Sequence, residues 1–247
     1  MRIGILGDIH SNLEALTTVV DAMRDEGVDH WVQVGDIIGY GPDPRPCIEI
    51  VRALNCTVCM GNHDAAVVGM LNTDYFNTYA RAAIDWTREQ LEPADLDYLR
   101  GLPLVVEHHS YTVVHGTLHM PEFFGYVLTQ VEAEESLRQQ RTLMGFVGHS
   151  HVPAIYLEHP GREPHDLDVV YESETEISVE GATKVLANVG SVGQPRDEDP
   201  RAAYALYDTE AKTLAIRRVA YDYPSCQAKI RAAGLPDVLA ERLHLGV

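Results

Sequence analysis

The sequence is poor in positive charge. Of its 247 residues, 19 are Lys or Arg and 37 are Asp or Glu, so the formal net charge is −18. Nucleic acids are bound mainly through basic surfaces that neutralise their phosphates. The composition therefore argues against a long nucleic acid as a partner. A small phosphorylated molecule stays compatible with it, because bound metal ions reverse the potential of a site locally.

Long apolar runs are also missing. The N-terminal run is interrupted by Asp8 and His10, which makes it too short for the apolar region of a signal peptide. No other stretch approaches the ~20 apolar residues needed to cross a bilayer. We therefore expect a cytoplasmic protein with no membrane partner.

Cysteine is scarce, with four residues in the chain. Cys56 and Cys59 have the CxxC spacing that is typical of zinc or redox chemistry. The pair lies in an expected strand, however, where residues three apart point to opposite faces. No second CxxC is present to complete a zinc site. We interpret both as buried structural thiols.

The first half of the chain alternates apolar strands with amphipathic helices. The first strand, residues 2–8, is followed by a helix with apolar residues at helical spacing that stops at Gly27. Two more strands are expected at residues 30–36 and 56–60, with a helix at residues 46–54 between them. Such alternation predicts a mainly parallel sheet covered by helices.

The second half changes character. Residues 73–101 are expected to be helical, and strands follow at residues 104–116 and 142–151. The last third is mostly extended, with a hairpin turn at residues 208–210 and a short helix at residues 225–233.

No repeat, low-complexity segment or linker divides the chain. A length of 247 residues is common for a single α/β enzyme domain. We therefore predict one domain, residues 1–247, of the α/β class with two packed sheets.

Five polar clusters each follow an expected strand. They are Asp8-Ile9-His10, Gly35-Asp36, Gly61-Asn62-His63-Asp64, His115-Gly116 and Gly148-His149-Ser150-His151. The carboxyl ends of parallel strands meet at one edge of a sheet, where ligands bind. We expect the five clusters to converge there, although more than 140 residues of chain separate the first from the last.

The residue types in these clusters suit two divalent cations. Carboxylate and amide oxygens together with imidazole nitrogens favour Mn, Fe, Zn, Ni or Co over a magnesium site built from oxygens alone. Each cluster alone is a weak signal, whereas the ordered set of five predicts a metal centre.

The order DxH, GD, GNHD, HG and GHSH resembles the calcineurin-like metallophosphoesterase superfamily. The segments GDIHSNLEAL and NVGSVGQPRD are most similar to its small bacterial and archaeal branch, which has phosphodiesterase activity. The resemblance covers roughly residues 1–200. It implies a four-layer αββα sandwich of two mixed β-sheets flanked by helices, with a dinuclear metal site at the carboxyl ends of the strands.

The resemblance also implies a role for each cluster. One metal ion would be held by Asp8, His10 and His151, and the other by Asn62, His115 and His149. Asp36 would bridge the two ions. His63 would stand near the substrate oxygens without binding metal, and Asp64 would orient it by a hydrogen bond. The motif that usually reads GHTH is GHSH here, which leaves both imidazoles in place.

The implied activity is hydrolysis of a phosphoester by a hydroxide that bridges the two metal ions. A phosphodiester is slightly preferred as the substrate. The alternatives are a phosphomonoesterase that acts on nucleotides, dinucleoside polyphosphates or phosphoproteins, a nuclease for short oligonucleotides, and a non-catalytic binding scaffold with the same fold. The expected partner is a small phosphorylated substrate, and a homo-oligomer is compatible with the sequence.

Three further features have alternative interpretations. Asn12 is predicted to contact substrate or to cap the first helix. Arg196 suits phosphate binding, or it forms a salt bridge with a neighbouring acidic residue of the segment Asp197-Glu198-Asp199. The loop His119 to Tyr126 contains three aromatic residues that could stack on a leaving group, pack beneath the loop or form a subunit contact.

Overall fold

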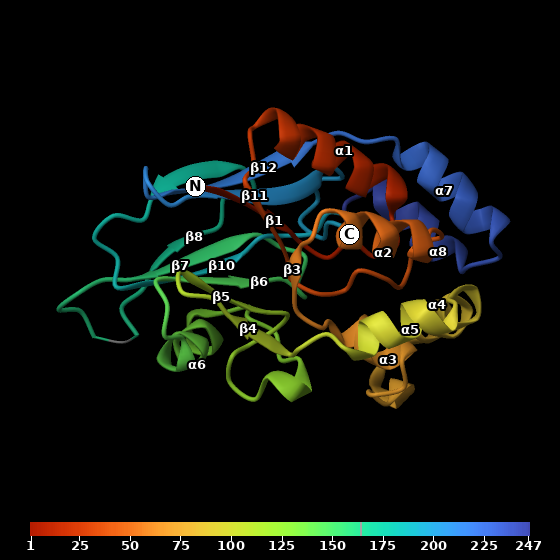
Figure 1. Cartoon of the computed structure of the whole chain (residues 1–247), viewed down its shortest axis with the longest axis horizontal. Coiled ribbons are helices and arrows are strands. Elements are labelled where there is room, and N and C mark those ends of the chain that lie inside the picture. Colours follow the sequence, from red (N-terminus) through yellow and green to blue (C-terminus); the bar gives the residue numbers. More distant parts are fainter. Residues whose placement is uncertain (164) are drawn as a thin grey trace.

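A computed structural model describes residues 1–163 and 165–247. Two six-stranded sheets lie face to face, with helices outside them (Figure 1). The first sheet has the strand order β3-β2-β1-β11-β12-β9, and the second has the order β4-β5-β6-β10-β7-β8. Both sheets are mixed, and the predicted four-layer α/β arrangement is confirmed.

The first sheet is built from the two ends of the chain. Its parallel part consists of β1 (Arg2–Leu6), β2 (His30–Gln33) and β3 (Thr57–Val58). Antiparallel strands complete the sheet, namely β11 (Ala202–Asp208), β12 (Thr213–Val219) and β9 (Thr175–Ser178). The hairpin between β11 and β12 is the one that the sequence predicts.

The second sheet comes from the middle of the chain. Its parallel strands are β5 (Tyr111–Val114), β6 (Met144–Val147) and β10 (Lys184–Asn188). Antiparallel strands flank them on both sides, and these are β4 (Val105–Glu107), β7 (Ala154–Glu158) and β8 (Asp168–Val170).

Helices cover both sheets and one end of the sandwich (Figure 1). The first sheet is covered by α1 (Leu13–Asp25) and α2 (Pro44–Ala53), beside which lie α7 (Tyr223–Ala232), α8 (Asp237–Glu241) and the 3₁₀ turn η3 (Arg242–His244). The second sheet is covered by α6 (Gln130–Gln139). A separate group at one end consists of α3 (Asn62–Val67), η1 (Thr73–Tyr75), α4 (Thr78–Gln90) and α5 (Pro93–Arg100). The turn η2 (Pro121–Phe123) lies in the loop after β5.

The apolar core lies in three layers that follow from the strand pattern. Strands buried on both faces, such as β1 and β6, have near-continuous apolar sequences. Ile3 and Ile5 of β1 pack between the sheets against residues such as Phe146 of β6. Leu6 packs on the other face of the first sheet against Leu16 of α1. The outer face of the second sheet is closed by Leu137 and other apolar residues of α6.

This topology brings the carboxyl ends of six parallel strands to one edge. The two sheets are joined there by a parallel bridge between Asp8, which follows β1, and Ser191, which follows β10. Gly148, which follows β6, donates its backbone N–H to the carbonyl oxygen of His115, 2.9 Å away. The loops after these strands therefore meet over the seam between the sheets.

Some of the predicted elements differ in extent. The third strand is two residues long, and Cys56 and Cys59 lie on either side of it as free thiols, one half-buried and one buried. The second helix begins two residues earlier than expected, with Pro44 in its first turn, where proline is favoured. Helix α6, which the strand and motif patterns do not predict, begins at a capping box formed by Thr129 and Glu132. Within the described residues no helix is both long and apolar enough to span a membrane.

Candidate metal centre

The five polar clusters meet at the edge where the parallel strands end. Buried groups of ligating atoms lie within 4.8 Å of one another in three sets. The first set is Asp8, His10 and His151; the second is Asp36, His115 and His149; and the third is His10, Asp36 and His63. The sequence places these residues in five separate loops, and the fold brings them together.

Three of the imidazole rings are held by backbone carbonyl groups. Nδ1 of His10 lies 3.1 Å from the Ile38 carbonyl oxygen, and Nδ1 of His115 lies 2.9 Å from that of Val34. Nδ1 of His151 lies 2.6 Å from the carbonyl oxygen of Gln194. A carbonyl oxygen only accepts hydrogen bonds, so each Nδ1 carries the proton and donates it. These hydrogen bonds orient each ring so that its Nε2 atom faces the centre of the site.

The inward atoms of the first set are mostly acceptors. Nε2 of His10 lies 3.1 Å from Nε2 of His151, which is 3.2 Å from the nearer carboxylate oxygen of Asp8. Burial is the main reason that the pKa values of both imidazoles are lowered, so neither ring holds a second proton near neutral pH. Two bare nitrogen atoms and a carboxylate thus converge, an arrangement that a cation stabilises.

The second set is centred on His115. Its Nε2 lies 3.0 Å from Oδ1 of Asn62 and 3.1 Å from Nδ1 of His149, and a carboxylate oxygen of Asp36 lies 3.3 Å away. Burial lowers the pKa of His115, but Asp36 and Asp8 outweigh it and raise the pKa to about 9. Burial instead lowers the pKa of His149 to about 3. The surroundings therefore favour positive charge at this point of the site.

The carboxylate of Asp36 belongs to both halves of the centre. Its Oδ2 atom lies 3.3 Å from Nε2 of His115 and 3.6 Å from Nε2 of His10. Burial opposes its ionisation, but the imidazoles around it, first His115 and then His63, hold its pKa well below the usual range. The neighbouring rings, His151 first, likewise hold the pKa of the buried Asp8 carboxyl well below its usual range.

The backbone is bent to aim these side chains. His10, Asp36, His149 and His151 all have positive φ angles, between 48° and 68°. Each non-glycine residue in that region costs of the order of 1 kcal/mol, and such residues cluster at functional sites. Packing and hydrogen bonds around the site hold these strained conformations. The cluster of strained residues indicates that the backbone geometry here serves ligand binding.

Two of the clusters begin with glycine for a steric reason. A Cβ atom on Gly148 would lie 2.4 Å from Oδ1 of Asp8, and one on Gly61 would lie 2.1 Å from Oδ1 of Asp36. Both distances are far below contact distance. The GN and GH pairs therefore bring backbone into direct contact with the two carboxylates.

His63 lies beside the centre. Its ring contacts His10 and Tyr40, with centroid distances of 4.9 and 4.4 Å, and the edge of Phe76 at 5.2 Å. Burial lowers its pKa to about 4, so the ring is neutral near neutral pH. Its side chain lines the cavity that opens from the centre.

The predicted hydrogen bond between Asp64 and the ring of His63 is wrong. Within the described residues, the hydrogen-bond partners of the Asp64 carboxylate are backbone N–H groups, those of Asp36 at 2.8 Å, Gly61 at 3.0 Å and Ile38 at 3.4 Å. Burial, and next the charge of Asp36, raises the pKa of Asp64 to about 7. Asp64 thus ties the loop after β2 to the start of α3 and positions Asp36 and Asn62.

Asn12 caps the first helix. Its Oδ1 accepts the backbone N–H of Ala15 at 3.1 Å, and its Nδ2 donates to the Gly193 carbonyl oxygen at 2.8 Å and to the Tyr221 hydroxyl at 3.2 Å. The side chain is 1% exposed. These bonds use the oxygen and both amide hydrogens, so the capping alternative fits the structure, and the predicted contact with substrate does not.

Arg196 faces the cavity, and its predicted ion pair is not formed within the described part of the chain. Asp197 binds Arg218, and Asp199 binds Arg201 at 2.7 Å. The guanidinium of Arg196 instead donates to the Gln194 side chain at 2.8 Å and lies 5.7 Å from the centroid of the Tyr40 ring. Its Nε is buried and has no hydrogen-bond partner among the residues that the structure describes.

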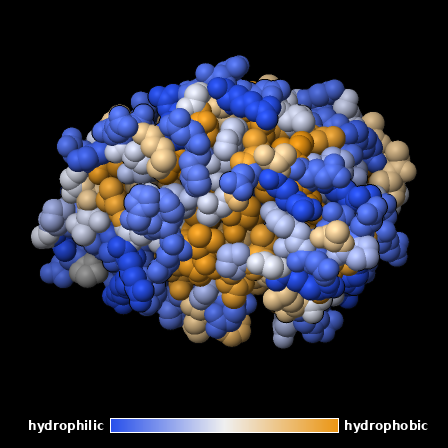
Figure 2. All heavy atoms as spheres, viewed as in Figure 1, coloured by the Kyte–Doolittle hydropathy of each residue, from blue (hydrophilic) through white to orange (hydrophobic). Residues whose placement is uncertain are grey.

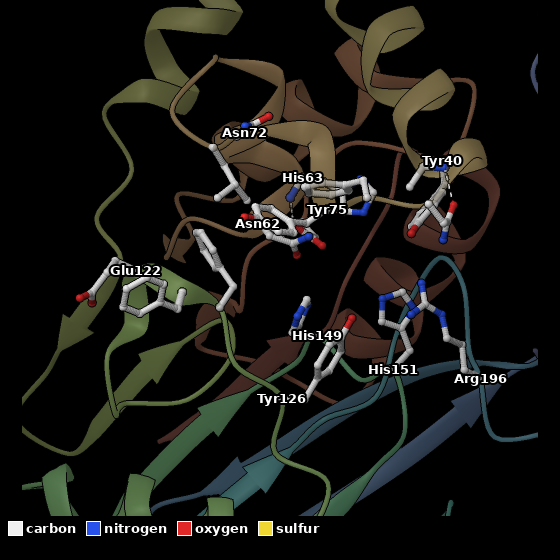
Figure 3. Close-up of a pocket in the computed structure, with 17 residues that line it drawn as sticks. Tyr40, Asn62, His63, Asn72, Tyr75, Glu122, Tyr126, His149, His151 and Arg196 are labelled. Atoms are coloured by element: carbon white, nitrogen blue, oxygen red, sulfur yellow. Dashed lines mark hydrogen bonds between the residues drawn. The ribbon is translucent and has the colours of Figure 1, made fainter.

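A cavity of about 540 Å³ opens from the centre. Asn62, His63, Asn72 and Tyr75 lie on one side of it, and Tyr126, His149, His151 and Arg196 lie on the other (Figure 3). The ring of Tyr126 stacks on His149, with centroids 3.9 Å apart. The sequence predicts the centre itself but not the wall formed by the chain between α3 and α4, because its aromatic residues have no motif around them.

Comparison with known proteins agrees with this geometry. A profile described as "Calcineurin-like phosphoesterase superfamily domain" matches residues 1–212. The chain belongs to the calcineurin-like phosphoesterase superfamily. It is therefore a metallophosphoesterase, a hydrolase of phosphoester bonds, and its family uses divalent metal ions.

Relatives of this metallophosphoesterase are similar over their full length. An uncharacterized protein of Methanocaldococcus jannaschii is 37% identical over 248 residues, which cover 99% of this chain and 98% of the relative. The crystal structure of a metallophosphoesterase from Sphaerobacter thermophilus is 39% identical, with a TM-score of 0.88 over 100% of this chain and 99% of that one. A hypothetical protein of Pyrococcus horikoshii has the same fold, with 22% identity and a TM-score of 0.79 over 100% of this chain and 98% of that one.

Replacement of Asn12 by Ala should reduce the free energy of unfolding by about 2–3 kcal/mol, because it removes a helix cap and leaves buried partners unsatisfied. The matched control is Asp222→Ala, which removes the exposed cap of α7 and should cost about 1 kcal/mol. Chemical denaturation measures both. Equal losses in the two variants would show that the buried bonds of Asn12 contribute nothing beyond the cap.

Proposed function

We propose that the whole chain, residues 1–247, acts as one metallophosphoesterase domain that hydrolyses a phosphodiester with two divalent cations. The observation that supports this most is the set of inward-facing acceptors, in which the neutral Nε2 atoms of His10 and His151 lie 3.1 Å apart. A buried pair of lone pairs is destabilising without a positive charge between them. The donor types, imidazole nitrogen with carboxylate and amide oxygen, suit Mn, Fe, Zn, Ni or Co.

Seven side chains would hold the two ions. Asp8, His10 and His151 would bind the first, and Asn62, His115 and His149 would bind the second, with Asp36 shared between them. When bound, such a pair of ions activates water as a nucleophile near neutral pH and neutralises charge on the phosphoryl oxygens. Backbone carbonyl groups accept the Nδ1 hydrogen of His10, His115 and His151, so the Nε2 atom of each ring is the one that would face the ions.

The other residues act on the substrate. His63 is neutral and lines the cavity, so it donates a hydrogen bond to the phosphoryl or leaving oxygen as charge develops there. Asp64 has no contact with substrate and holds the loops that carry Asp36 and Asn62. Arg196 lies on the cavity wall, and its guanidinium binds a phosphoryl oxygen.

A phosphodiester is favoured over a monoester by the space beside the centre. The cavity extends well past His63 and His149 and has room for a second ester group. A phosphatase for nucleotides or phosphoproteins is the alternative within the same chemistry, since its reaction needs the same centre.

The manganese-loaded protein should hydrolyse bis-p-nitrophenyl phosphate with a higher kcat/KM than p-nitrophenyl phosphate. The two substrates release the same phenol, so a single absorbance assay compares them directly. A preference for the monoester would move the assignment to a phosphatase. Failure to turn over either substrate with any of the five candidate metals would contradict phosphoester hydrolysis at this site.

Replacement of His63 by Ala should lower kcat by about a hundredfold or more while metal content stays near that of the unchanged protein. The reason is that His63 acts on the substrate oxygens and not on the ions. The control is His10→Ala, for which metal content and turnover should fall together. Metal analysis and steady-state kinetics on the same samples decide the point, and loss of metal in the His63 variant would make that residue a ligand.

A further inference from the structure

One half of the cavity contains none of the predicted metal ligands. Beyond the predicted ligands and His63, its wall is made by the chain around η1 on one side and by the loop after β5 on the other. The residues there include Tyr75 and Phe76 from the first segment, and Glu122, Phe123, Phe124 and Tyr126 from the second. The two segments are about 50 residues apart in the sequence, and neither contains a ligand.

Aromatic rings line this half, and two of them are largely exposed. Tyr75 is 93% exposed and Phe123 is 72% exposed, whereas Phe124 is buried against the site. Large apolar side chains exposed together mark binding surfaces more often than chance. Figure 2 shows hydrophobic residues gathered at the lower centre of the face in view, over the region of β3 and β4, with hydrophilic residues over much of the rest. The exposed rings of Tyr75 and Phe123 have apolar area available for a ligand.

The wall is continuous with the centre through stacked rings. Tyr126, which is 46% exposed, lies parallel to His149 at an interplanar angle of 13°. Phe76 meets the ring of His63 edge-on, at 85°. A group attached to a phosphoryl at the centre would thus enter a part of the cavity lined by Phe76 and Tyr126. Figure 3 shows Tyr126 beside His149 on the cavity wall.

Charge in this half opposes a second anion. Among the described residues that line the cavity, the one permanent cation is Arg196, which lies beside Tyr40 and His151 at the metal end. Glu122 lies at the outer end. A second phosphate or a carboxylate placed there would have an acidic neighbour and no basic one, and its desolvation would not be offset.

We propose that this half of the cavity is a subsite for an uncharged, flat, aromatic ester arm of the phosphodiester. The proposal rests on the proposed function, because the metal centre must hold the phosphoryl group to which the arm is attached. The subsite selects a substrate whose second ester group is a planar ring, such as an aryl group or the base of a nucleoside, and rejects one that carries further phosphates. Stacking on Tyr75 and Phe123 supplies the attraction.

Phosphonates test the subsite without turnover, because their carbon–phosphorus bond is not an ester. Calorimetry on the manganese-loaded protein should give a Kd for phenylphosphonate about tenfold lower than that for methylphosphonate. In the double variant Tyr75→Ala, Phe123→Ala the ratio of the two constants should fall toward one. A third probe, 4-phosphonobenzoate, should lose the advantage of the phenyl group, because its carboxylate would lie in the half that has no cation.

The control variant is Tyr79→Ala, which removes a half-exposed tyrosine four residues after Tyr75 and outside the cavity wall. It should keep the preference for phenylphosphonate, and an equal loss in the control and the double variant would overturn the proposal. Equal binding of phenyl- and methylphosphonate by the unchanged protein would also overturn it and leave the phosphoesterase assignment intact. Failure to bind both compounds, with metal present, would contradict the proposed function itself.

Discussion

Two imidazole nitrogens, Nε2 of His10 and Nε2 of His151, face each other 3.1 Å apart in the interior of this protein, and neither has a proton to donate. Around them lie the carboxylates of Asp8 and Asp36, which the neighbouring rings keep ionised. Such a cluster is unfavourable in a protein interior unless positive charge occupies it. The arrangement of these side chains therefore requires a cation, and that cation is what the proposed hydrolysis uses.

The fold meets this need through rigid elements at the site and strain in the loops. Six parallel strand ends bring the ligating loops to one seam, and backbone carbonyl groups fix the tautomers of three rings. Positive φ angles at four of the predicted ligands carry a conformational cost that the surrounding bonds must offset. Glycines at positions 61 and 148 let the backbone touch the carboxylates. The strained loop residues thus lower the stability of the protein locally while they place the ligating side chains.

The sequence was sufficient for the parts that depend on local pattern. Apolar runs that alternate with amphipathic helices predicted the strands, and the placement of DxH, GNHD and GHSH after them predicted which residues meet. It failed where the outcome depends on packing between distant segments. Whether Asn12 caps or contacts substrate is decided by Gly193 and Tyr221, roughly 200 residues away. The partner of Asp64 is likewise set by how the loop after β2 lies over α3. The aromatic wall of the cavity also depends on such packing. The sequence indicates the aromatic residues of the loop His119 to Tyr126, but not that this loop and residues 71–80 line the same cavity.

The most direct test of a shared two-ion centre is electron paramagnetic resonance of the protein loaded with two equivalents of Mn²⁺. Because Asp36 lies between both sets of ligands, the two ions should be magnetically coupled and give the multiline spectrum of a Mn²⁺ pair, and Asp36→Asn should weaken that coupling. A spectrum of isolated Mn²⁺ alone, at any loading, would contradict the shared centre on which this assignment depends.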